Sequence, residues 1–116
     1  EKFRSKAAIK RIAAETFSEW GLPTVECVTS VREQIGNQPV IASGGIKTGL
    51  DAAKTIALGA DLVGFGRSIL REATQSPEDI IEAMETRELE LRMTMFGIGA
   101  VSLKELNETD RLQIRP

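Results

Sequence analysis

The sequence contains no histidine, no tyrosine and only one cysteine in 116 residues. With a single thiol, Cys27, the chain cannot form an internal disulfide, and it lacks the histidine that usually activates a catalytic cysteine. Free cysteine is commonly buried as a small apolar side chain, so we interpret Cys27 as a packing residue. General acid–base chemistry by histidine or tyrosine is excluded for the residues of this chain.

Long apolar runs and clusters of one charge are missing as well. No run approaches the roughly 18 to 20 residues of a membrane-spanning helix, and no signal-peptide pattern opens the chain. We therefore expect a cytoplasmic protein with no membrane partner. The 15 basic and 17 acidic residues are interleaved, as in residues 1–6 and 85–88, so we expect no nucleic-acid partner.

Apolar spacing and turn residues predict helices in the first part of the chain. A helix is expected over 5–19, and Trp20–Pro23 ends it because proline favours an extended conformation before it. Thr24 is expected to cap a second helix, which Gly36 ends.

Two short apolar segments, 39–42 and 61–65, are predicted as buried strands. Between them, Thr48 and Asp51 form a capping-box pattern for a helix that runs to about residue 58. A strand, a crossover helix and a second strand make a parallel βαβ unit. After it, Ser76 opens a long helix with an apolar face that reaches Ile98.

Two parallel strands do not make a domain, because parallel sheets are buried on both faces and lone strands leave edges unpaired. Either several chains complete the sheet or the rest of it lies upstream. The second interpretation is favoured by the first residue, which is Glu1 rather than methionine. No repeat or linker divides residues 1–116, so we expect an α/β chain that forms one part of a larger parallel fold.

Each predicted strand is followed by a glycine-bearing turn, Gly44–Gly45 after the first and Gly64–Gly66 after the second. Such turns are often only tight connections. Two of them at the same edge of a sheet, next to helix termini, favour a phosphate site, because glycine lets an anion reach backbone N–H groups. Lys47 and Arg67 either add charge or lie in solvent, and we expect their backbone N–H groups to contribute more than their side chains. In a (β/α)₈ barrel, the loops after strands seven and eight form this kind of site.

Several motifs together resemble type 2 isopentenyl-diphosphate isomerase. They are WGLPT at 20–24, IASGGIKTGLDAAK at 41–54, ALGAD at 57–61, and ELR at 90–92 with MFGIGA at 95–100. The resemblance covers nearly the whole chain and only the C-terminal part of the family. It implies an FMN-dependent TIM barrel, of which this chain carries strands seven and eight with their helices.

The resemblance also implies a function, the reversible conversion of isopentenyl diphosphate to dimethylallyl diphosphate. It implies reduced FMN as cofactor, NADPH as reductant, Mg²⁺, and a homo-oligomeric parent enzyme. Catalytic residues, metal ligands and most flavin-ring contacts would come from upstream strands, so none is assigned here. The cofactor-binding residues expected in this chain are Ser43, Gly44, Gly45, Ile46, Lys47, Gly66 and Arg67.

Three alternatives stay open at this point. FMN-dependent hydroxyacid oxidases also carry the Gly66–Arg67 pair, although they usually have aspartate where this chain has Ser43. The FMN domain of glutamate synthase has motifs similar to the Gly-Leu-Pro and Gly-Gly-x-Lys-Thr-Gly segments of this chain. The isolated chain is, in the third alternative, a non-catalytic phosphate-binding or assembly fragment.

Overall fold

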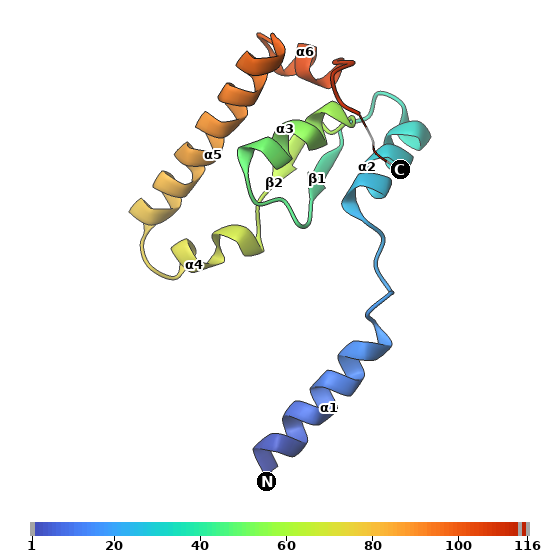
Figure 1. Ribbon diagram of the computed structural model, residues 1–116, viewed down its shortest axis with the longest axis vertical. Helices are drawn as coiled ribbons and strands as arrows, with labels where there is room; N and C mark the ends of the chain where they lie inside the picture. The colour runs from blue at the N-terminus through green and yellow to red at the C-terminus, as the bar shows by residue number, and fades with distance from the viewer. Residues whose placement is uncertain (1, 114, 116) are drawn as a thin grey trace.

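The predicted alternation of helices and strands is present in the computed structural model, which describes residues 2–113 and 115 and the side chains from Lys6 onward (Figure 1). Along the chain the elements are α1 (Lys2–Thr16), α2 (Thr24–Ile35), β1 (Ile41–Ser43), α3 (Gly49–Ala57), β2 (Leu62–Gly64), the 3-10 helix η1 (Arg67–Ile69), α4 (Leu70–Ala73), α5 (Pro77–Ile98) and α6 (Leu103–Asn107). The strands β1 and β2 pair in parallel, with Ile41 opposite Leu62. The α/β class and the parallel βαβ unit are therefore confirmed.

Helix α3 begins where the sequence pattern places it. The Thr48 hydroxyl accepts a hydrogen bond from the Asp51 amide at 3.1 Å, and the Asp51 carboxylate accepts one from the Thr48 amide at 3.2 Å. These two bonds form the predicted capping box and satisfy amides that a helix start leaves free. At α5 the Ser76 hydroxyl makes the first of these bonds, by accepting from the Asp79 amide at 3.1 Å.

The two faces of the sheet differ in burial. On the face under the helices, Ala42 is 4% exposed and packs with Val28 of α2. Side chains of strand residues alternate between the faces, so the neighbouring Ile41 points the other way and is 70% exposed. Leu62, its partner on β2, is 59% exposed. One apolar face of the sheet is thus covered and the opposite one is open.

The ends of several elements shift by one to three residues from the prediction, as at α1, which ends at Thr16 rather than at residue 19. Two further features differ. Thr24 does not cap α2: it is the first residue of that helix, and its hydroxyl donates instead to the carbonyl of Gly44, 20 residues along the chain. Helix α6 was not predicted, although Ser102 caps it. Its Leu106 is 1% exposed and belongs to the core, and the Asn107 amide group donates to the carbonyls of Ile56 and Ala60.

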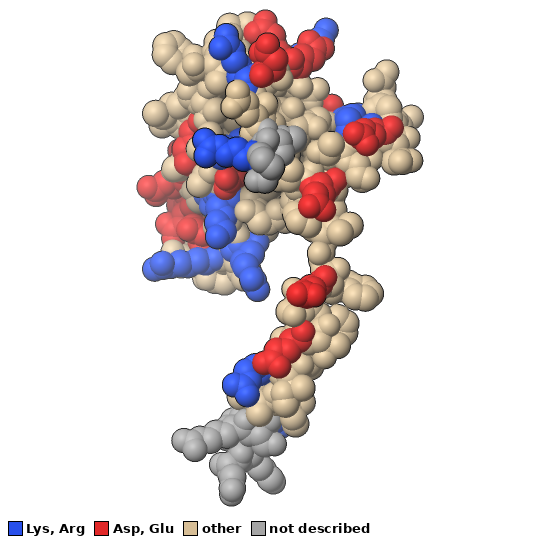
Figure 2. Space-filling model, turned by 45° about the vertical axis from the view of Figure 1, so that its right-hand side comes forward, with Lys and Arg blue, Asp and Glu red and all other residues tan. Residues whose placement is uncertain are grey.

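Acidic and basic side chains are interspersed on one face of the molecule (Figure 2). On the face drawn in Figure 2, acidic and basic residues lie next to one another on both the main body and α1.

Among the described ion pairs, Arg32 and Asp61 make the most additional hydrogen bonds. Arg32 Nη2 and Asp61 Oδ2 lie 2.6 Å apart. Asp61 also accepts from the Val40 amide at 2.8 Å, and Arg32 donates to the Gly59 carbonyl as well. Hydrogen bonds from the Val40 amide and from Arg32 hold the pKa of Asp61 below its usual range.

This shift predicts how replacement of Asp61 by asparagine depends on pH. A carboxyl group whose pKa is lowered by folding stabilises the protein above its unfolded-state pKa of about 4, and this contribution disappears as the pH falls through the folded value. We expect Asp61→Asn to lower the free energy of unfolding at pH 7 and to have little effect at pH values well below 4. Urea unfolding at both pH values measures this. Asp110→Asn, at a nearly fully exposed position, is the matched control, and an equal loss at both pH values would contradict the prediction.

Candidate phosphate site at the carboxyl end of the sheet

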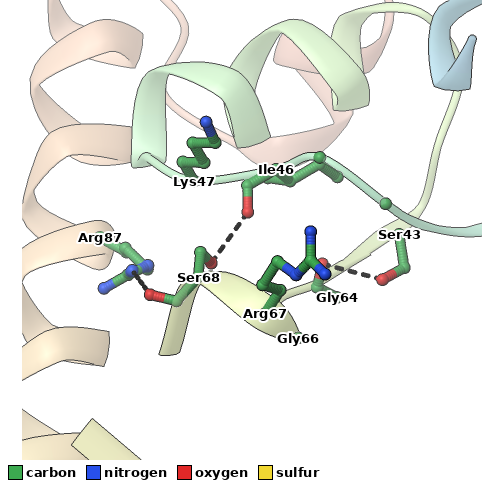
Figure 3. A pocket seen from close by; sticks show the side chains of 10 residues that line it. Ser43, Ile46, Lys47, Gly64, Gly66, Arg67, Ser68 and Arg87 are labelled. Atoms are coloured by element: carbon green, nitrogen blue, oxygen red, sulfur yellow. Dashed lines mark hydrogen bonds between the residues drawn. The ribbon is translucent and has the colours of Figure 1, made fainter. Parts of the chain in front are cut away.

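The two glycine-bearing turns lie side by side at the carboxyl ends of β1 and β2, where they border a cavity of about 530 Å³ (Figure 3). Both turns, η1 and the middle of α5 contribute to its wall. The lining residues are Ser43, Gly44, Gly45, Ile46, Lys47, Gly64, Gly66, Arg67, Ser68 and Arg87. The structure therefore brings together all seven site residues that the sequence predicted.

The first turn has a backbone conformation that suits glycine. Gly44 and Gly45 have φ angles of +107° and +71°, in the region that L side chains rarely adopt. A Cβ atom at Gly45 would meet nothing within 4 Å, so the space beside this residue is open. Ile46, only 6% exposed, anchors the turn in the core. Within the described chain, the amides of Gly45 and Ile46 have no hydrogen-bond acceptor, which leaves both for an anion.

The second turn approaches the first closely. A Cβ atom at Gly64 would lie 3.3 Å from Ser43 Oγ, and the Ser43 hydroxyl donates to the Gly64 carbonyl at 3.2 Å. No atom lies within 4 Å of where a Cβ of Gly66 would be. The amides of Gly66 and Arg67 likewise have no acceptor among the described residues. Figure 3 shows the Arg67 side chain directed into the space between the turns.

The charges around the cavity favour an anion. Three basic residues line it, Lys47, Arg67 and Arg87, and none of the lining residues is acidic. The amide of Lys47, however, donates to Asp51 at 3.1 Å, which corrects the expectation that this amide is free. Although burial alone would raise the pKa of Asp51, hydrogen bonds from the amides of Lys47 and Thr48 keep it below its usual range. The Lys47 side chain is exposed, and the residue lies in the lining of the cavity.

Sequence reasoning missed two residues that connect the site. The Ser68 hydroxyl donates to the Ile46 carbonyl at 3.0 Å and so links η1 to the first turn. Arg87 of α5 donates to the Ser68 carbonyl at 3.0 Å and lies over the Phe65 ring at 5.2 Å. Arg87 stands three residues after Met84 and four before Leu91, so it lies on the face of α5 that the sequence predicts to be apolar. A charged residue among these apolar positions was the signal in the sequence that could have identified Arg87.

Other candidate chemistry is limited. Cys27 is half-buried in α2 and does not line the cavity. Among residues 2–113 and 115, no three His, Cys, Asp or Glu side chains gather as a metal site. None of the helices in this part of the chain has a stretch long and apolar enough to cross a membrane.

Comparison with known proteins identifies the family. Residues 19–113 match the family described as FMN-dependent dehydrogenase. The chain is 56% identical over 114 residues to isopentenyl-diphosphate delta-isomerase of Oceanobacillus iheyensis, covering 98% of this chain and 33% of that protein. The isomerase of Vibrio campbellii is 47% identical over 100 residues, or 86% and 30% of the two chains. That of Nostoc sp. is 40% identical over 110 residues, or 95% and 31%.

The chain thus spans about a third of the length of these curated relatives. All three carry the name of the isomerase family that the motifs resemble, so the resemblance is confirmed. The amides without an acceptor among the described residues, the basic lining and the open space beside Gly45 and Gly66 fit the phosphate end of FMN, the cofactor in the family's description. The chain belongs to the FMN-dependent dehydrogenase family.

Proposed function

We propose that residues 1–116 form the C-terminal part of an FMN-dependent isopentenyl-diphosphate isomerase with the TIM-barrel fold. In this proposal β1 and β2 are strands seven and eight. The open sheet face supports it, because Ile41 and Leu62 are apolar, paired and largely exposed, and a barrel interior would cover them. The names and the greater length of the curated relatives support it as well.

The observation that carries the proposal is that two turns border one cavity with amides that have no acceptor among the described residues. Gly45 and Ile46 offer N–H groups from one turn, and Gly66 and Arg67 offer them from the other. Backbone donors from two turns that border the same cavity suit the several oxygens of a phosphate monoester. The Arg67 guanidinium adds a positive charge at the same place, where a charge-assisted hydrogen bond is stronger than a neutral one.

The role of this chain in the reaction is to hold one end of the cofactor. Reduced FMN, when bound, would supply the proton addition and removal that move the double bond of isopentenyl diphosphate to give dimethylallyl diphosphate. The two turns would anchor the phosphate of FMN and so fix where its ring lies. Positioning of this kind contributes strongly to rate, because reacting groups must be held in a near-attack geometry.

The remaining parts of the proposal rest on the family alone. They are NADPH as reductant, Mg²⁺ at ligands outside this chain, a homo-oligomeric enzyme and a cytoplasmic location. Catalytic groups are assigned to the rest of the barrel, because the cavity described above contains no histidine, tyrosine or carboxylate.

The proposal predicts that the 116-residue chain alone does not isomerise isopentenyl diphosphate, even with reduced FMN. Two strands with their turns supply contacts for the phosphate but no binding surface for the flavin ring or the substrate. The full-length protein is expected to be active under anaerobic, reducing conditions, and mixing the chain with the remainder of that protein should restore activity if the pieces rebuild the barrel. Conversion to dimethylallyl diphosphate is measured in each sample. An inactive full-length protein, or turnover by the chain alone, would contradict the proposal.

A further inference from the structure

Thr24 lies outside the cavity and yet touches the turn that forms it. Its hydroxyl donates to the Gly44 carbonyl at 2.8 Å. A Cβ atom at Gly44 would lie 3.2 Å from the Thr24 hydroxyl oxygen, so the contact is close enough that a side chain at Gly44 would disturb it. The two residues are 20 positions apart in sequence, and the hydrogen bond therefore joins α2 to the turn after β1.

The fold holds Thr24 in place for this contact. Pro23, with a φ angle of −58°, fixes the entry to α2. Val28, one helical turn after Thr24 and on the same face, is buried at 4% exposure against Ala42 of β1. The packing of Val28 on the strand thus directs Thr24 toward the carboxyl end of that strand, where the glycine turn begins.

The hydrogen bond determines which way the next amide points. In a trans peptide the C=O and N–H groups point in opposite directions. When Thr24 holds the Gly44 carbonyl toward α2, the N–H of the same peptide unit, which belongs to Gly45, points away from α2. That amide is one of the free donors at the cavity. Without the threonine hydroxyl, nothing else described in the chain holds this flexible Gly-Gly peptide in that orientation.

We propose that Thr24 is a positioning residue for phosphate recognition, which acts by orienting the Gly44–Gly45 peptide so that the Gly45 amide faces the anion. This inference rests on the proposed function and deepens it. It also gives the threonine of the WGLPT motif a role other than the helix cap that the sequence predicts. The affinity of the full protein for a phosphorylated flavin depends on this hydroxyl, whereas its affinity for the same flavin without phosphate does not.

The test compares FMN with riboflavin, which has the same ring and no phosphate. Dissociation constants of the full-length protein for both are measured by flavin fluorescence for the wild type and three variants. Thr24→Val removes the hydroxyl at nearly constant shape, and Thr24→Ser keeps it. Thr29→Val is the matched control, because Thr29 is on the same helix and its hydroxyl donates only to the Val25 carbonyl of its own helix.

The wild type is expected to prefer FMN. Loss of one hydrogen bond that leaves a carbonyl unpaired should reduce this preference about tenfold in Thr24→Val. Thr24→Ser and Thr29→Val should retain it. If the wild type binds FMN no better than riboflavin, the proposed phosphate site itself is wrong. If the wild type prefers FMN and Thr24→Val keeps that preference, or weakens both flavins equally, the positioning role is wrong.

Discussion

Replacement of Gly45 by valine is expected to weaken FMN binding by the full-length protein about a hundredfold, with the fold preserved. Two effects act together at this position. A β-branched residue is strained at a φ angle of +71°. The added side chain also extends into the open space beside Gly45, through which a phosphate reaches the amides of Gly45 and Ile46. Riboflavin, which makes no phosphate contact, should bind nearly as before.

The control for this variant is Gly36→Val. Gly36 has a φ angle of +58° and open space around it, so it carries the same kind of backbone strain, but it ends α2 and does not line the cavity. Both variants should lose stability, and only Gly45→Val should lose its preference for FMN over riboflavin. Flavin titration and thermal unfolding of the two proteins measure this. Unchanged FMN affinity in Gly45→Val would show that the first turn is not part of the phosphate site.

Replacement of Gly49 by alanine is expected to destabilise the protein by about 3 kcal/mol, toward the upper end of the usual cost of forcing an extra methyl group into a packed interior. Gly49 is the first residue of α3 and is buried against α5. A Cβ atom there would lie 2.5 Å from the Leu91 backbone nitrogen and closer still to the Arg87 carbonyl oxygen. Both are backbone atoms of a long helix, so neither can move aside without shifting α5.

Replacement of Gly97 by alanine is expected to have the opposite effect on stability. Gly97 lies in α5, the helix against which Gly49 of α3 is packed. Gly97 is an exposed residue of α5 with no atom within 4 Å of its Cβ position, and alanine there should raise helix stability by up to about 1 kcal/mol. We therefore expect the free energies of unfolding of the two variants, measured by urea unfolding, to change in opposite directions. A Gly49→Ala protein as stable as the wild type would show that α3 and α5 are not packed as closely as described.

Short-range patterns explain why much of the fold was predictable. The capping box of Thr48 and Asp51 and the serine cap at Ser76 each join residues three apart. Such bonds form within one turn of chain, so local sequence contains all the atoms that they require. The same holds for α6, whose Ser102 accepts from the Glu105 amide at 3.1 Å. That pattern was present in the sequence and was not recognised.

The candidate site was predictable in its position more than in its contacts. Glycines after two strands of a βαβ unit place both turns at one edge, because parallel strands end on the same side. The structure confirms this arrangement for Gly45 and Gly66. The pattern of glycines does not predict which amides lack an acceptor. The Lys47 amide donates to the Asp51 carboxylate, because of the detailed geometry at the start of α3.

The sequence by itself determined most of the elements and their order, since these follow from periodicity and from bonds between near neighbours. It also determined the parallel pairing and the edge at which the glycine turns meet, because a crossover helix returns the chain to the same edge. Only the tertiary structure decided where three side chains donate: Thr24 to Gly44, Arg87 to Ser68, and Asn107 to Ile56 and Ala60. These bonds join residues 19 to 51 positions apart. Their formation depends on how the helices pack against the sheet, because a donor has many local acceptors within reach and packing alone selects the distant one.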